Sequence, residues 1–163
     1  MTAQRLDRVL KCYRIGDPTG SDPIFDPTGS KLYPGRWNTP GSPMIYTSEH
    51  YSTAMLEKLV HGSGSLPPNH HFIEITIPNG VTYEAVTPAH LPGWDHISCA
   101  VSRAYGEIWQ QSKRSLLLLV PSVVARMETN ILINAEHPEF PKLIPPSLHQ
   151  PVWWDRRLFG PAP

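Results

Sequence analysis

The sequence predicts an α+β fold, a compact single domain with a mixed or split β-sheet and a few short helices. Short apolar or alternating segments, typical of strands, are spread over the whole chain. Apolar residues recur at helical spacing over two longer stretches. These stretches separate groups of strands, whereas in a doubly wound sheet helices alternate with single strands. Proline accounts for 19 of the 163 residues, which favours short elements joined by rigid turns.

The first third of the chain predicts two short strands separated by a long loop. Residues 6–10 are expected to form a short helix and residues 11–15 the first strand. Residues 16–35 contain eight glycines and prolines, so we expect a loop, and loops of this length are usually functional or disordered. Residues 44–47 form the next expected strand.

Two longer helices are expected. Ser48 can cap the N-terminus of a helix that continues to about His61, with Gly62 as the stop. The second helix is expected over residues 96–111. Its apolar residues at helical spacing are Ile97, Ala100, Val101, Ala104, Tyr105, Ile108 and Trp109.

The remaining segments predict strands and an extended tail. Residues 72–77 alternate, so their three isoleucines should face the core, and a turn should pair them with residues 81–85 as a hairpin. Residues 116–120 and 129–134 are two further strands. The proline-rich tail, residues 138–159, is expected to lie extended over the core, held by its tryptophans.

Composition excludes several classes of protein. The length suits one domain spanning residues 1–163, with a core that needs no disulfide or metal. Lysine plus arginine equals aspartate plus glutamate at 14 each, whereas nucleic-acid binders usually carry excess positive charge, so no direct nucleic-acid binding is expected. Cys12 and Cys99 are far apart and the histidines are scattered, so no metal site is expected.

The chain is expected to be soluble and cytoplasmic, without membrane contact. The N-terminus carries charges too early for a signal peptide. No apolar run reaches the roughly 18 residues that a membrane helix needs.

A cation, a phenol and a carboxylate lie on three consecutive pieces of predicted structure. Arg36 is either a surface arginine or a fork of donors for phosphate. Tyr46 is either a core tyrosine or a ring that stacks on a base or nicotinamide. Glu57, beside an apolar helix face, is either a salt-bridged structural acid or a catalytic one. Together they could surround one anionic, sugar-containing ligand.

Three further polar residues lie at the ends of the later expected strands. Ser122 lacks the G-x-S-x-G context of a hydrolase nucleophile, so it is expected to act as a hydrogen-bonding hydroxyl at a strand end. Asn130 and Asn134 bracket an apolar strand, where a side-chain amide either caps a turn or binds a ligand. The chain contains no G-x-G-x-x-G, P-loop or H-E-x-x-H motif.

Taken together, these pieces resemble the RES domain, the toxin half of bacterial RES–Xre toxin–antitoxin pairs. Eight weak motifs occur in the family's order over nearly the whole chain, and Pro34 is a departure where a glycine is expected. The matching segments are Tyr13-Arg14-Ile15, Gly35-Arg36-Trp37-Asn38, Ile45-Tyr46-Thr47, residues 56–61, Val120-Pro121-Ser122, residues 128–134, His137-Pro138 and residues 155–159.

The resemblance implies an NAD-consuming enzyme with a fold similar to ADP-ribosyltransferases of the diphtheria-toxin type. NAD+ is then a substrate, no metal takes part, and the partner is an Xre-type helix-turn-helix antitoxin covering the NAD pocket. The implied catalytic residues are Glu57, Arg36 and Tyr46. The implied substrate-binding residues are Arg36, Tyr46, Ser122, Trp37, Asn38 and Asn130.

Four of the residues that the resemblance implies can be given a physically sensible task. Glu57 would bind the ribose and stabilise its positive charge in an oxocarbenium-like transition state. Arg36 would hold the pyrophosphate or the nicotinamide-side phosphate, and Tyr46 would stack on the nicotinamide. Ser122 would bind the ligand or orient Glu57.

The acceptor of ADP-ribose stays open between water, phosphate and a protein. Many protein-modifying transferases have a second acid two residues before the key glutamate, and Met55 in that place favours NAD degradation. The first alternative is ADP-ribosylation of a protein target with the same residues. An endoribonuclease is disfavoured by the zero net charge, and a binding module would pair Arg36 with Glu57.

Overall fold

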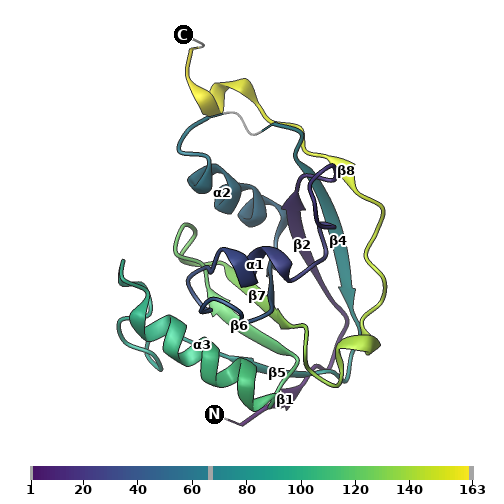
Figure 1. Ribbon diagram of the computed structural model, residues 1–163, viewed down its shortest axis with the longest axis vertical. Coiled ribbons are helices and arrows are strands. Elements are labelled where there is room, and N and C mark those ends of the chain that lie inside the picture. The colour runs from purple at the N-terminus through teal and green to yellow at the C-terminus, as the bar shows by residue number, and fades with distance from the viewer. Residues whose placement is uncertain (1, 66–67, 162–163) are drawn as a thin grey trace.

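One mixed sheet of eight strands organises the chain in the computed structural model, which describes residues 2–65 and 68–161 (Figure 1). The strand order is β1-β5-β6-β7-β3-β2-β4-β8. The strands are β1 (Gln4–Arg5), β2 (Leu10–Gly16), β3 (Met44–Ser48), β4 (His71–Ile77), β5 (Thr82–Ala85), β6 (Leu117–Pro121), β7 (Thr129–Asn134) and β8 (Gln150–Pro151). The helices are α1 (Thr28–Leu32), α2 (Tyr51–His61), α3 (Ala100–Ser112) and the 3-10 helices η1 (Phe140–Lys142) and η2 (Arg156–Phe159). The predicted α+β class with a mixed sheet is confirmed.

The join between β2 and β3 divides the sheet into two parts. The two strands pair antiparallel at Tyr13↔Ser48, whereas β2 pairs with β4 over seven positions, from Leu10↔Ile77 to Gly16↔His71. Beyond that single pair, the Arg14 guanidinium bridges β2 to β3 through the Tyr46 carbonyl. The two parts of the sheet therefore share no long ladder of hydrogen bonds at this join.

The predicted hairpin between residues 72–77 and 81–85 is wrong. The three isoleucines of β4 are buried as expected, but β4 pairs with β2 and β8. A turn at Gly80, with φ of +84°, leads instead into β5, which pairs antiparallel with β1 and parallel with β6. The turn residues predict a change of direction, and they do not specify the next strand's partner.

The N-terminal expectations need two corrections. Residues 6–10 form no helix, because Leu6 donates its backbone N–H to the Val81 carbonyl and Leu10 already begins β2. Ser48 does not cap α2, since it is the last residue of β3 and the helix begins at Tyr51 after His50. The predicted end at Gly62 is confirmed.

Helix α3 begins at Ala100, later than the expected start at His96, and only some of the apolar residues at helical spacing are buried. Ile97 lies before the helix and is 90% exposed, and Ile108 is 62% exposed. The buried residues of the helix are Ser102, Gly106, Trp109 and Gln110. A Cβ added at Gly106 would overlap the Trp37 carbonyl oxygen, so the helix contacts the 35–38 loop through this glycine. Trp109 fills the core between α3 and strands β6 and β7.

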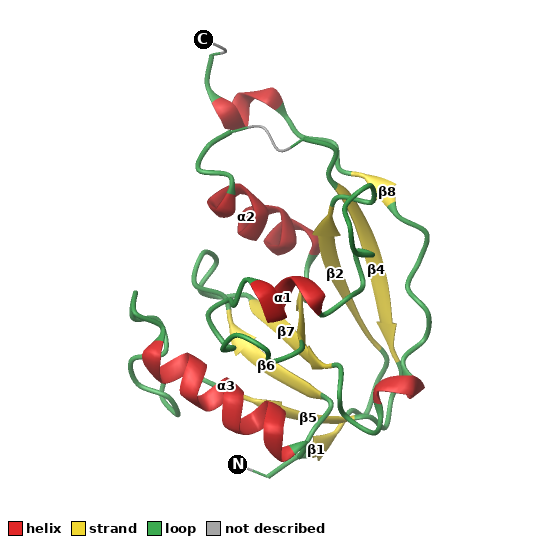
Figure 2. Ribbon diagram, viewed as in Figure 1, coloured by secondary structure: helices red, strands yellow, loops and turns green. Residues whose placement is uncertain are grey.

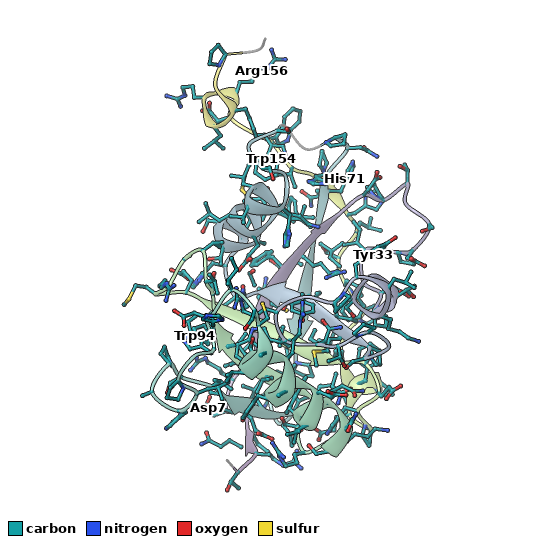
Figure 3. The ribbon with its side chains drawn as sticks, turned by 60° about the vertical axis from the view of Figure 1, so that its left-hand side comes forward. Asp7, Tyr33, His71, Trp94, Trp154 and Arg156 are labelled. Atoms are coloured by element: carbon teal, nitrogen blue, oxygen red, sulfur yellow. The ribbon has the colours of Figure 1, made fainter. Side chains whose placement is uncertain are left out.

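The tail was expected to lie over the core, but its β8 pairs with β4 at the edge of the sheet, and only part of the tail is anchored. Val152 is buried and packs with Trp154 against Ile15 and Ala54, whereas Trp153 is 85% exposed. Figure 3 labels Trp154 and Arg156 at the end of the molecule where η2 projects beyond α2. Among the residues that the structure describes, no helix is long and apolar enough to cross a membrane.

Candidate functional site

A cavity of about 660 Å³ opens beside the join between β2 and β3. In the view of Figure 2 the helices α2, α1 and α3 follow one another from top to bottom. Residues of α1 and α2 line the cavity. Its wall includes residues from β2, α1, the 33–37 loop, β3, α2 and β7, together with Cys99 at the start of α3. Five of the seven predicted site residues line it: Arg36, Trp37, Tyr46, Glu57 and Asn130.

Glu57 reaches the cavity from one face of α2. Ala54 and His61, which lie three positions before and four positions after Glu57 along the helix, line the cavity with it, and so does the adjacent Lys58. The Glu57 Oε1 atom accepts hydrogen bonds from Ser122 Oγ at 2.9 Å and from Asn130 Nδ2 at 2.6 Å. Its Oε2 atom has no donor within residues 2–65 and 68–161. One carboxylate oxygen is thus held by the protein and the other is available to a ligand.

Ser122 contacts Glu57 from behind the cavity wall. It is fully buried and does not line the cavity. Its hydroxyl accepts the Ala125 backbone N–H at 3.1 Å, so its single proton is directed to Glu57. The geometry therefore supports the expected orienting role of Ser122 and gives it no direct route to a ligand.

The Tyr46 hydroxyl is used by the loop that carries Arg36. It donates to Asn38 Oδ1 at 2.7 Å and accepts the Trp37 backbone N–H at 3.0 Å. Gly35 permits this contact, because a Cβ there would lie 2.8 Å from the hydroxyl. Burial raises the pKa of Tyr46, so the phenol stays neutral. The Tyr46 ring forms cavity wall while its hydroxyl anchors the loop.

Asn38 does not reach the cavity, in contrast to the expected substrate contact. Its side chain is fully buried, and its nitrogen donates to the carbonyls of Ser30, Thr39 and Ser42. Its Oδ1 atom accepts from the Gly35 backbone and from Tyr46. All its polar atoms are therefore used to order the 35–42 segment.

Arg36 and Trp37 are held by Trp94 and His96, which precede α3. Arg36 Nη1 donates to the carbonyls of Trp94 at 3.1 Å and His96 at 2.9 Å. Trp37, only 3% exposed, stacks on Trp94, which Figure 3 labels, with ring centroids 6.4 Å apart. Within the described residues Arg36 forms no salt bridge with Glu57, so the expected pairing of a binding module is not observed.

Two cations of the cavity wall were missed by sequence reasoning, Arg14 and Lys58. Arg14 donates from Nε to the Ile24 carbonyl at 2.6 Å and from Nη1 to Tyr46, which fixes its guanidinium. Burial lowers the pKa of the Lys58 amine, and the nearby Arg14 charge lowers it further. In the described part of the chain neither forms a salt bridge. Both residues lie inside the motifs already noted, but neither pattern shows that its side chain turns inward.

The cavity therefore combines three cations with one carboxylate. Arg14, Arg36 and Lys58 suit a ligand with phosphate groups, and Glu57 suits hydroxyls or a developing positive charge. No group of three or more histidine, cysteine, aspartate or glutamate side chains that could hold a metal ion occurs in the described ranges.

Comparison with known proteins gives consistent matches. The family model described as RES domain matches residues 11–155. A Sphingobium protein named "Prs ADP-ribosylating toxin" is 45% identical over 140 residues, 83% of either chain. A Pseudomonas putida protein named "Toxin Res" is 34% identical over 115 residues, covering 69% of this chain and 78% of that one.

A solved structure shares the fold. A chain of the Mycobacterium tuberculosis MbcT–MbcA toxin–antitoxin complex superimposes with a TM-score of 0.72 and 13% identity. The match covers 91% of the present chain and 86% of the other.

Proposed function

Because the chain belongs to the RES domain family, we propose that it consumes NAD+ by cleaving the bond between nicotinamide and ribose in the cavity beside α2. The observation that carries this proposal is the Glu57 carboxylate, held through Oε1 by Ser122 and Asn130 in a cavity lined by three cations. We take it to be the toxin of a toxin–antitoxin pair, in line with the names of its relatives.

Glu57 provides the electrostatic stabilisation that this reaction needs. When the ribose C1–nitrogen bond breaks, both electrons leave with nicotinamide, which departs neutral, and positive charge moves onto the ribose. No general acid is required. A fixed carboxylate near the ribose stabilises this charge in the transition state more than in the bound substrate. The available Oε2 atom takes this role.

The cations hold the pyrophosphate. Arg14 and Lys58 present partly buried positive charge to the cavity, and Arg36 adds a third from the loop. Buried charges without carboxylate partners are costly in the free protein and are compensated when an anion binds. Tyr46 forms the wall against which the nicotinamide ring packs, and its hydroxyl acts through the loop.

Water or phosphate completes the reaction in the main proposal. Attack by water on C1 releases one proton and gives ADP-ribose, and attack by phosphate gives a phosphorylated ADP-ribose. The absence of an acid at Met55 does not bear on this choice. Residues two apart on a helix point in nearly opposite directions, and Met55 packs with Ile15 and Val152.

Transfer of ADP-ribose to a protein is the second candidate. It uses the same site, with a nucleophilic side chain attacking C1 in place of water. The relative named "Prs ADP-ribosylating toxin", at 45% identity, is the specific observation that favours it.

An antitoxin is the proposed partner. The structural neighbour is a chain from a toxin–antitoxin complex. The RES resemblance suggests that the antitoxin is an Xre-type helix-turn-helix protein. We propose that it covers the cavity and excludes NAD+.

The experiment incubates the purified chain with NAD+ labelled in the adenylate part, with and without phosphate, and with and without cell lysate. Nicotinamide with free ADP-ribose identifies a glycohydrolase, and a phosphate-dependent product identifies a phosphorylase. Label that stays on protein identifies a transferase. Intact NAD+ in every arm, with folded protein free of antitoxin, contradicts the proposal.

A further inference from the structure

Ser48 lies at the far end of the hydrogen-bonded chain that leads to Glu57. Its hydroxyl donates to Asn130 Oδ1 at 2.7 Å, and Asn130 Nδ2 donates to Glu57 Oε1 at 2.6 Å. We infer that Ser48 is a positioning residue, which acts through the Asn130 amide to fix the Glu57 carboxylate. This inference rests on the proposed function, since it concerns how the same site is held.

The sheet places the first two members of this chain side by side. Ser48 and Asn130 are direct partners in the antiparallel register of β3 and β7, and Ser48 is only 4% exposed. The adjacent Thr47 has a hydroxyl too, but it donates to the Ile131 backbone carbonyl at 2.7 Å. Position 48 is therefore where a hydroxyl on β3 meets the Asn130 side chain.

The Asn130 amide needs an anchor at both ends. If the amide turned over, its oxygen would face the Glu57 carboxylate at hydrogen-bond distance, and two acceptors would repel each other. The serine hydroxyl satisfies Oδ1 in the observed orientation, and donation to that oxygen also strengthens the N–H donors of the same amide. Among the residues that the structure describes, the Asn130 amide without Ser48 would be held only by the carboxylate that it is meant to position.

The second donor to Glu57 is anchored in the same way. Ser122 accepts the Ala125 backbone N–H, so its proton is directed to Oε1. Oε1 is thus fixed by two donors, and each donor is oriented by a third group. A carboxylate held in this manner stays in place when the ribose charge develops, so its reorganisation costs little.

The test measures NAD+ turnover by Ser48→Ala, Ser48→Thr, Asn130→Ala and the Ser48→Ala/Asn130→Ala double variant. We expect Ser48→Ala to lower kcat about 5-fold with KM changed less than about twofold, because the lost contact serves the transition state. Ser48→Thr keeps the hydroxyl and should restore most of kcat. In the Asn130→Ala background the Ser48 change should have no further effect, because its partner is gone.

A structural control and a second readout complete the design. Ser115→Ala removes another fully buried hydroxyl, which contacts Trp109 and Glu84 away from the cavity, so it should lower stability without lowering kcat. The side-chain amide signal of Asn130 in NMR, assigned by its loss in Asn130→Ala, should shift and broaden in Ser48→Ala and not in Ser115→Ala.

The outcomes separate the two proposals. If wild-type protein degrades NAD+ and Asn130→Ala is impaired but Ser48→Ala keeps full kcat, the role of Ser48 is overturned and the proposed function stands. Equal losses from Ser48→Ala in both backgrounds also overturn it. If the wild type shows no turnover, the proposed function fails, and an Asn130 signal unchanged by Ser48→Ala overturns the positioning role by itself.

Discussion

The carboxylate of Glu57 is oriented by donors from distant parts of the chain. Asn130 is 73 residues away and Ser122 is 65 residues away. The order of the motifs predicted that Arg36, Tyr46 and Glu57 belong to one site, and all three line one cavity. Their contacts were not predictable, because they depend on how β3, β6 and β7 lie beside α2. The inward positions of Arg14 and Lys58 escaped prediction for the same reason.

Removing the Lys58 charge should weaken the binding of NAD+ without lowering the stability of the fold. Lys58→Met keeps the apolar stem, so we expect KM for NAD+ to rise about 10-fold with little change in kcat. The free energy of unfolding should stay equal or increase, because a desolvated ammonium near Arg14 is lost. Steady-state kinetics and urea denaturation measure both effects, with the exposed Lys113→Met as control. An unchanged KM would remove Lys58 from the binding site.

The Tyr46 hydroxyl should matter for the loop more than for chemistry. Tyr46→Phe leaves the Trp37 N–H and Asn38 Oδ1 without this partner, so we expect a loss of about 1–3 kcal/mol in the free energy of unfolding. Tyr83→Phe is the matched control, since its hydroxyl bonds the exposed Gln4 side chain and should cost less than about 0.5 kcal/mol. Urea denaturation of both variants checks this, and equal losses would contradict the loop-anchoring role.

At the scale of elements, strand existence was easier to predict than strand pairing. The alternation in residues 72–77 and the apolar run at residues 116–120 indicate which side chains are buried, and both segments form strands. Pairing is decided by contacts between distant segments, so the expected hairpin was wrong. For α3 the spacing predicted a helix but not which residues make its contact with the rest of the protein, where a glycine and a buried tryptophan pack.

Gly106 should be essential for docking α3 on the 35–38 loop. In Gly106→Ala the new methyl group would overlap the Trp37 backbone, so helix and loop must separate. We expect a loss of more than about 2 kcal/mol in stability, despite the better helix propensity of alanine. Gly29→Ala in α1 is the control for stability, because its added Cβ meets nothing within 4 Å. Thermal unfolding compares them, and a Gly106→Ala protein as stable as wild type would contradict this packing.

At the scale of the whole molecule, Glu139 links segments that are far apart in the sequence. It accepts hydrogen bonds from Arg5 near the N-terminus, Thr82 on β5 and Lys142 on η1. Burial alone would raise the pKa of Glu139, but hydrogen bonds from Thr82, Lys142 and Arg5 outweigh it and hold the pKa well below its usual range. Sequence patterns predicted the α+β class and could not reveal this link, because each partner is an ordinary surface residue type.

The Glu139 network should make stability depend on acid pH. Because the folded pKa is depressed, its stabilisation is complete above the unfolded pKa, about 4.3, and declines as pH falls through the folded pKa. Glu139→Gln should therefore be less stable than wild type at pH 7, and the difference should narrow at pH 3. Urea denaturation at the two pH values measures this. If the difference in the free energy of unfolding between wild type and Glu139→Gln were the same at both pH values, the Glu139 charge would have no part in the stabilisation.

The most direct test of the account is nicotinamide release from NAD+ by wild-type protein and by Glu57→Gln, followed by chromatography. The glutamine keeps the size of the side chain and an oxygen for Ser122 and Asn130, so both proteins should be equally folded. We predict release by the wild type and at least about a 100-fold lower rate for the variant, because the negative charge is lost. Equal rates would contradict the central role of Glu57 in NAD+ cleavage.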